Sequence, residues 1–126
     1  MSQAFGDKIT LPASKRAKEQ MNELKSSELF GELRDVWILG ASLGIAANGK
    51  LSGDARETFQ NVNTLDPDGI LAAIMIGLYP DITSDERVKI LVDHAEWGID
   101  MMHKQYKNGI LDLLKLNCIN AQDNQL

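Results

Sequence analysis

Hydrophobic residues recur at intervals of three and four along most of this chain, which is the spacing of an α-helix with a buried side. The pattern is longest between Thr83 and Asn108, where Thr83 and Glu86 can form a capping box and Gly109 can end the helix. We therefore predict one long helix here, with the rest of the chain packed around it. Its apolar residues share two adjacent arcs of a helical wheel: Val88, Leu91, Ala95, Ile99, Met102, Tyr106, Ile90, Trp97 and Met101. Its opposite, polar arc is predicted to face water and consists of Lys89, Asp93, Glu96, Asp100, His103 and Lys107.

A first amphipathic helix is predicted to begin at Ser14, whose hydroxyl can cap the free N–H groups of the first turn. Ala17, Met21 and Leu24 follow at helical spacing and form its buried stripe. A second, short helical element is expected from Glu28, because an acidic residue suits the positive end of a helix dipole.

The run from Val36 to Ala47 is apolar on nearly all sides, which predicts a buried helix that stops at Asn48-Gly49. Gly40 and Gly44 lie four residues apart on one face of this helix, so another helix backbone can approach closely there. These glycines do not form a phosphate-binding loop, because the Gly-Lys-Ser/Thr ending of such loops is missing.

Residues 48–66 are polar and are predicted to be a connection with a weak helical turn at 52–58. Asp66 and Pro67 then carry the signals of a helix start, and Pro80 ends the helix. The apolar residues of this helix are Ile70, Leu71, Ile74, Met75 and Leu78.

The flanking segments are expected to be less regular. Residues 1–12 are predicted to be an irregular arm, in which an extended piece at 8–11 would need a partner strand, and residues 110–116 are predicted to be a last short helix before a flexible tail at 117–126. The predicted fold is therefore all-α, a compact bundle of about four to six helices that forms a single domain over the whole chain.

Composition excludes several classes of protein. An apolar fraction of 44% and a charged fraction of 25% are typical of a folded, soluble domain. The single cysteine, Cys118, allows no internal disulfide and no cysteine-based metal site, and we expect a buried or half-buried thiol. We expect no cofactor, no signal peptide, no membrane-spanning segment and a cytoplasmic location.

The net charge of -5 arises in the second half of the chain, which argues against nucleic-acid binding by the whole surface. A local basic surface is the alternative, although solvation of these side chains is a simpler explanation of them. The residues of this candidate nucleic-acid-binding site are Lys8, Lys15, Arg16, Lys18, Arg34 and Lys50.

A metal or acid/base site is also geometrically conceivable on the long helix. Glu96, Asp100 and His103 follow at intervals of four and three, which places their side chains on one stripe. The competing interpretation is a solvated face, because lysines share that stripe. His94 is expected to be a histidine at the edge of the core beside Trp97, and no Ser/His/Asp or Cys/His motif of a hydrolase is present.

Two stretches, RDVWILGASLGIAANGK and AEWGIDMMHKQYKNGILDLL, carry a resemblance to a known group of proteins. They resemble small helical proteins encoded beside DNA phosphorothioation systems and related restriction clusters, over about residues 30–116. The resemblance implies a non-catalytic accessory protein of a DNA-modification or defence locus that works through protein contacts and, in a related protein, through a basic DNA-binding surface. The matching residues are Arg34, Asp35, Leu43, Gly44, Tyr106, Asn108 and Gly109.

The sequence thus favours a non-catalytic protein-interaction module in a prokaryotic DNA-modification or defence setting. Self-association is expected, because a helix that is apolar on nearly all sides needs a cover that a second copy can supply. A DNA-binding accessory and a metal-dependent enzyme are the two alternatives.

Overall fold

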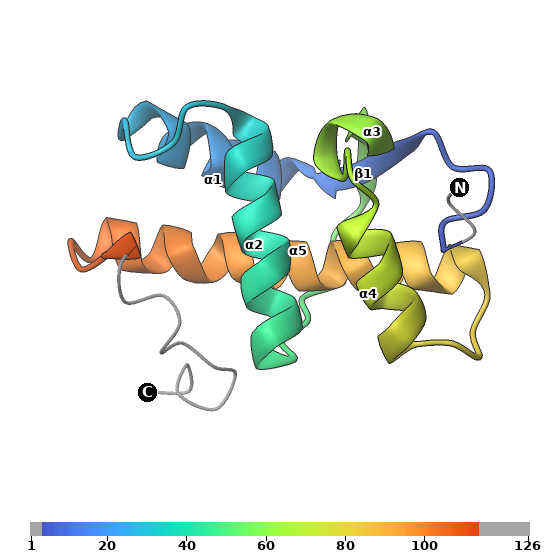
Figure 1. Cartoon of the computed structure of the whole chain (residues 1–126). Helices are drawn as coiled ribbons and strands as arrows, with labels where there is room; N and C mark the ends of the chain where they lie inside the picture. Colours follow the sequence, from blue (N-terminus) through green and yellow to red (C-terminus); the bar gives the residue numbers. More distant parts are fainter. Residues whose placement is uncertain (1–3, 114–126) are drawn as a thin grey trace.

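The computed structural model describes residues 4–113 of the chain. In chain order, its elements are β1 (Thr10–Ser14), α1 (Lys15–Ser26), α2 (Leu33–Ala47), β2 (Arg56–Asn61), α3 (Val62–Leu65), α4 (Ile70–Leu78) and α5 (Ser84–Lys107). Figure 1 shows α5 running along the molecule, with α1, α2 and α4 arranged on it. Within the described part, no helix has the length and hydrophobicity that are required to cross a bilayer.

Helix α5 confirms the long helix predicted after Thr83. The Thr83 hydroxyl oxygen accepts a hydrogen bond from Glu86 N at 3.1 Å, and the Glu86 carboxylate accepts one from Thr83 N at 3.1 Å, so the predicted capping box is present. At the other end, Gly109 has a φ of +72° and donates its N–H to the Tyr106 carbonyl. A glycine can adopt this left-handed conformation without strain, and α5 therefore ends at Lys107 with Asn108 as its C-cap.

Helix α2 crosses α5 in direct backbone contact (Figure 1). A Cβ on Gly44 would overlap the carbonyl of His94, and a Cβ on Gly98 would overlap the carbonyl of Gly40. A Cβ on Gly40 would lie 2.9 Å from the Ala95 carbonyl oxygen. The predicted close approach at Gly40 and Gly44 is therefore confirmed, and Gly98 completes it from the α5 side.

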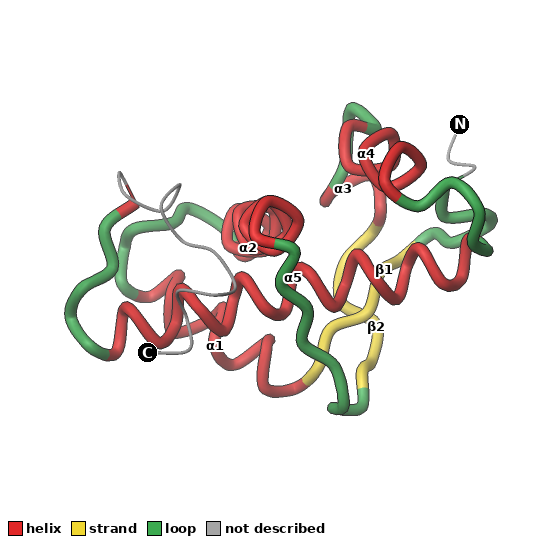
Figure 2. Tube along the Cα trace, turned by 90° about the horizontal axis from the view of Figure 1, so that it is seen from below, coloured by secondary structure: helices red, strands yellow, loops and turns green. Residues whose placement is uncertain are grey.

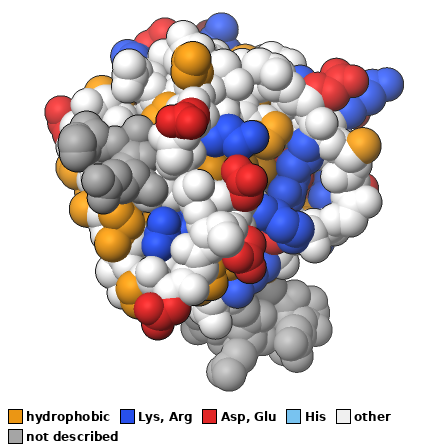
Figure 3. All heavy atoms as spheres, turned by 90° about the vertical axis from the view of Figure 1, so that its right-hand side faces the viewer, with side chains coloured by type: hydrophobic (Ala, Val, Ile, Leu, Met, Phe, Trp, Pro, Cys, Tyr) orange, Lys and Arg blue, Asp and Glu red, His pale blue; other side chains and the backbone are white. Residues whose placement is uncertain are grey.

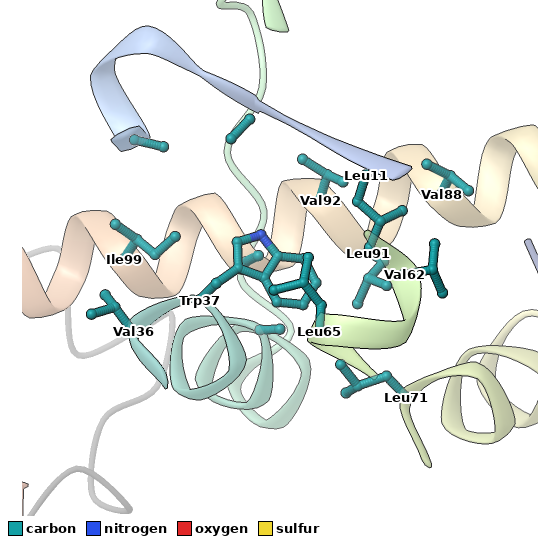
Figure 4. Packing of buried hydrophobic residues seen from close by; sticks show 14 of the residues in the cluster. Leu11, Val36, Trp37, Val62, Leu65, Leu71, Val88, Leu91, Val92 and Ile99 are labelled. Carbon is teal, nitrogen blue, oxygen red and sulfur yellow. The ribbon is translucent and has the colours of Figure 1, made fainter. Parts of the chain in front are cut away.

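The core lies between α5 and the elements that cover it. Trp37 of α2 is fully buried, and Figure 4 shows its ring among Leu65 of α3 and Leu91 and Val92 of α5. Leu11 of β1 is also fully buried and belongs to the same cluster. Helices and strands therefore share one hydrophobic core, in which each large side chain contributes about 1.5–3 kcal/mol on burial.

The prediction of an all-α fold is wrong, because β1 and β2 form a two-stranded antiparallel sheet. The register pairs Thr10 with Asn61 and Ser14 with Arg56, with an irregularity after Leu11. Figure 2 shows the two strands side by side and α2 end-on against α5. The fold is mixed, since an extended segment that would be marginal as a two-stranded ribbon is held by packing on α5.

Three local predictions also need correction. Part of the segment 52–58, expected to be a helical turn, is instead the beginning of β2, and residues 28–31 are not helical because Glu28 has a φ of +71°. Helix α4 begins at Ile70 rather than at Pro67. Asp66 still caps this helix, because its carboxylate accepts hydrogen bonds from the N–H groups of residues 71 and 72.

The C-terminal predictions are only partly within the described residues. Residues 110–112 have no regular structure, so the predicted helix at 110–116 does not begin there. The rest of that segment, Cys118 and the tail at 117–126 lie outside the described residues.

Candidate functional site

Helix α4 presents an apolar face to the solvent. Its nine residues, ILAAIMIGL, include no polar side chain. The residues of its buried side are Leu71, Ala72 and Met75. The large residues of its exposed side are Ile70, Ile74, Ile76 and Leu78, with exposed fractions of 59%, 38%, 41% and 53%. A helix at the surface of a soluble domain normally carries polar residues on its outer side, so this face is typical of one that a partner covers.

The exposed side of α4 has the surface shape that helices use to pack against one another. Ile70, Ile74 and Leu78 follow at intervals of four and form a ridge along the helix. Ala73 and Gly77 lie beside this ridge and leave a shallow strip, and a Cβ on Gly77 would meet no atom within 4 Å. A ridge with a strip of small residues next to it is how one helix receives the side chains of another.

Acidic residues flank the α4 face. Between Arg56 and Arg87 the sequence has six acidic residues and no lysine or arginine. Asp68 precedes α4, Asp81 follows it and Asp85 lies in the first turn of α5, and all three are exposed. Figure 3 shows hydrophobic side chains at the surface of this end of the molecule among both acidic and basic ones. Cations also lie near the end of α4: Lys50 Nζ lies 5.5 Å from the ring centre of Tyr79, and the buried Arg87 donates hydrogen bonds to the carbonyls of Tyr79 and Pro80.

A second feature is a buried polar cluster that joins α5 to both strands. The Glu96 carboxylate accepts hydrogen bonds from Ser14 N at 2.7 Å and from Ser14 Oγ at 2.8 Å. Arg56 Nη2 donates to Asp93 Oδ1 at 2.7 Å, and Lys89 Nζ lies 3.0 Å from Asp93 Oδ2. Arg56 Nε lies 3.3 Å from Glu96 Oε2, which is close enough for an ion pair although the angle of a hydrogen bond is not met.

The prediction that Asp93 and Glu96 face water is therefore wrong, since they are 4% and 2% exposed. A helical wheel describes one helix in isolation, and the sheet covers this side of α5. Ser14 does cap α1 as predicted, because its Oγ accepts a hydrogen bond from Ala17 N at 3.0 Å. The same hydroxyl donates to Glu96, so the cap and the cluster are one hydrogen-bonded unit.

The three residues of the candidate metal site have separate partners. Glu96 belongs to the buried cluster, whereas Asp100 Oδ1 accepts a hydrogen bond from Gln20 Nε2 at 2.9 Å. His103 Nε2 lies 3.1 Å from Glu23 Oε1. Across residues 4–113, no group of three or more His, Cys, Asp or Glu side chains has an arrangement that could hold a metal ion.

His94 is fully buried rather than at the edge of the core. Its Nδ1 lies 2.7 Å from the Gly49 carbonyl oxygen, which can only accept, so Nδ1 carries the proton. Nε2 is then the acceptor for the Tyr79 hydroxyl at 3.1 Å. Burial lowers the pKa of His94, while the hydrogen bond to Gly49 opposes that shift and the positive charge of Lys50 adds to it. His94 is therefore a neutral structural link between α5 and the segments after α2 and α4.

Three of the six cations predicted to bind nucleic acid lie together in the first turn of α1, namely Lys15, Arg16 and Lys18. Arg16 is paired with Asp54 at 3.2 Å. Lys18 Nζ donates to the Thr58 carbonyl at 3.1 Å. This hydrogen bond joins α1 to β2 at the position where the register places Thr58 opposite Pro12.

The other three predicted cations are placed elsewhere. Lys8 lies before β1, Arg34 forms an ion pair with Glu32 at 3.0 Å in the first turn of α2, and Lys50 lies over the Tyr79 ring. DNA binding therefore stays a prediction, and three of the six predicted cations lie close together rather than all six.

The residues that carried the family resemblance occupy helix ends and the helix crossing. Asp35 accepts a hydrogen bond from Glu32 N at 3.0 Å and completes a capping box at the start of α2. Gly44 lies at the crossing with α5, and Asn108 and Gly109 end α5.

Sequence reasoning did not identify the open face of α4 or the Ser14–Glu96 contact. The first had a visible signal, because residues 70–78 contain no polar side chain that could face water. The second had none, because the two residues are 82 positions apart.

The comparisons with known proteins bear on the fold. No family model matches the sequence, and no curated protein matches it. Among solved structures, the chain is similar to DndE from Escherichia coli B7A, a protein involved in DNA phosphorothioation modification. The TM-score is 0.57 and the sequence identity 16%, over 74% of this chain and 94% of DndE. The resemblance to small helical proteins of phosphorothioation systems is thereby confirmed at the level of the fold.

Proposed function

We propose that this chain is a non-catalytic protein-interaction module of a DNA phosphorothioation system and that the α4 face is its contact surface. The observation that carries the proposal is the exposed apolar side of α4, from Ile70 to Leu78. The likeness to DndE supports the setting, because it extends over 94% of that protein.

The placement of the polar groups supports a non-catalytic role. Glu96, Asp93 and His94 are buried and use their hydrogen-bonding atoms inside the fold. A pocket of about 380 Å³ beside α4 is lined in part by Asp66 and Asp68, but the residues around it include no nucleophile with a neighbouring base. Asp66 already accepts two backbone hydrogen bonds.

The proposal is tested in a host whose own copy of the gene is replaced by variants. Phosphorothioate linkages in digested genomic DNA are measured by mass spectrometry. Ile74→Asp is expected to lower their content as far as deletion of the gene does, because a buried carboxylate at the contact costs several kcal/mol. Ile110→Asp is the matched control, since Ile110 is 66% exposed and lies beyond α5, and it is expected to leave the content unchanged.

Two results would contradict the proposal in different ways. Normal phosphorothioate content after gene deletion would show that the protein is not required by a DNA phosphorothioation system. If the phosphorothioate content falls on gene deletion but not in the Ile74→Asp variant, the α4 face is not the contact surface. Self-association stays a prediction from the sequence, and light scattering of the purified chain measures it directly.

A further inference from the structure

We infer that the α4 face binds a basic amphipathic helix of another protein. We name this partner on the basis of the proposed function, to which it adds the chemistry of the bound segment. The apolar ridge, the strip beside it and the charges around them each restrict what can be bound.

The apolar part of the face favours a helix. The ridge of Ile70, Ile74 and Leu78 is about two turns long, and a partner helix that carries apolar residues at intervals of three and four can place them in the strip along Ala73 and Gly77. Gly77 has open space around its Cα, so nothing in the described fold occupies this position.

The charges select the partner. Asp68 lies just before α4, Asp81 lies just after it, and Asp85 lies in the first turn of α5, so exposed carboxylates lie close to both ends of the apolar face. Lysine or arginine residues beside the apolar stripe of a partner would meet these carboxylates. A second copy of this chain would instead bring two acid-flanked faces together, which opposes association. An anionic membrane surface is disfavoured for the same reason.

Binding is tested with two fluorescein-labelled peptides of about 18 residues, long enough for a stable amphipathic helix. Both carry leucine at the positions of one helical face. One has lysine at the remaining positions and the other has glutamate. Fluorescence anisotropy is expected to show that the lysine peptide binds the full chain roughly tenfold or more tightly than the glutamate peptide, with an affinity that falls as salt is added.

Variants separate the apolar and charged contributions. Ile74→Asp is expected to abolish binding of the lysine peptide, and Ile110→Asp is expected to leave it unchanged. The combined Asp68→Asn, Asp81→Asn and Asp85→Asn variant is expected to retain weaker binding with little salt dependence. Circular dichroism checks that each variant keeps the fold, which is the expected result because all the altered side chains are exposed.

Several outcomes overturn the inference. Equal binding of the two peptides, or binding of neither, shows that the α4 face does not select a basic amphipathic helix. A wild-type dimer that Ile74→Asp dissociates shows that a second copy covers the face. Binding to phosphatidylcholine vesicles that Ile74→Asp abolishes assigns the face to a membrane. If only the peptide result is negative while Ile74→Asp still lowers phosphorothioate content, the proposed function stands and the partner chemistry is wrong.

Discussion

Gly98 of α5 lies against the backbone of Gly40 of α2 so closely that a Cβ on Gly98 would overlap the Gly40 carbonyl. The neighbour is backbone, which cannot move aside as a flexible side chain can. We predict that Gly98→Ala lowers the free energy of unfolding by about 3 kcal/mol or more, because the helices must separate at the centre of the core. Urea denaturation of the purified variant measures this change.

Gly77→Ala is the matched control, with the opposite expected sign. Gly77 also lies in a helix, but a Cβ there would meet no atom within 4 Å. The substitution is expected to raise the free energy of unfolding by about 0.5–1 kcal/mol through the higher helix propensity of alanine. Equal effects of the two substitutions would mean that the crossing is not in backbone contact.

Glu96→Gln is predicted to destabilise the fold by about 2–4 kcal/mol. The carboxylate accepts two hydrogen bonds from Ser14 and lies 3.3 Å from Arg56, so the amide loses one acceptor and leaves a mostly buried guanidinium with less compensation. Thermal and urea unfolding measure the loss. Glu19→Gln, at an exposed position of α1, should change stability by no more than about 0.5 kcal/mol, and a similar value for Glu96→Gln would contradict a structural role of the cluster.

The helices were predictable because their signals are local. Ser14 and the Thr83–Glu86 pair cap helices within one turn, and the spacing of apolar residues follows each helix along its own sequence. The sheet was not predictable in the same way, because β1 pairs with a strand that lies more than forty residues later in the sequence. An extended piece at 8–11 was expected if a partner existed, but the partner strand is mostly exposed and has no clear alternation of buried residues.

The candidate site was predictable in part for related reasons. The apolar composition of α4 was visible, whereas the side left uncovered depends on how few contacts the helix makes with the rest of the fold. The buried state of Glu96 depends on Ser14, which lies in a distant segment. A wheel drawn for one helix contains neither kind of information.

Gly109→Val is predicted to destabilise the end of α5 by about 1 kcal/mol or more. The φ of Gly109 is +72°, a left-handed conformation that a β-branched residue adopts only with strain. A lower melting temperature is expected, and differential scanning calorimetry measures it. Among the described residues, no atom lies within 4 Å of a Cβ at this position, so backbone strain is the expected cause, and an unchanged melting temperature would show that the left-handed cap is not required.

His94 makes stability depend on pH in the mildly acidic range. Burial lowers the pKa of His94 in the folded chain below its ordinary value of 6.5, which applies to the unfolded chain. As the pH falls through the unfolded value, the unfolded chain gains a proton that the folded chain does not, so the free energy of unfolding decreases. The contribution is complete above the unfolded pKa and is lost progressively as the pH falls toward the lowered pKa of the fold.

The measurement is the urea midpoint at about pH 7.5 and about pH 5.5, a range in which histidine titrates and most carboxylates remain ionised. The wild-type midpoint is expected to be lower at the acidic pH. His94→Asn can keep a donor toward the Gly49 carbonyl but cannot take up a proton, so its midpoint should depend less on pH even if it is lower throughout. His103 and the carboxylates are common to both proteins, and an identical pH dependence in the variant would show that the buried imidazole is not its source.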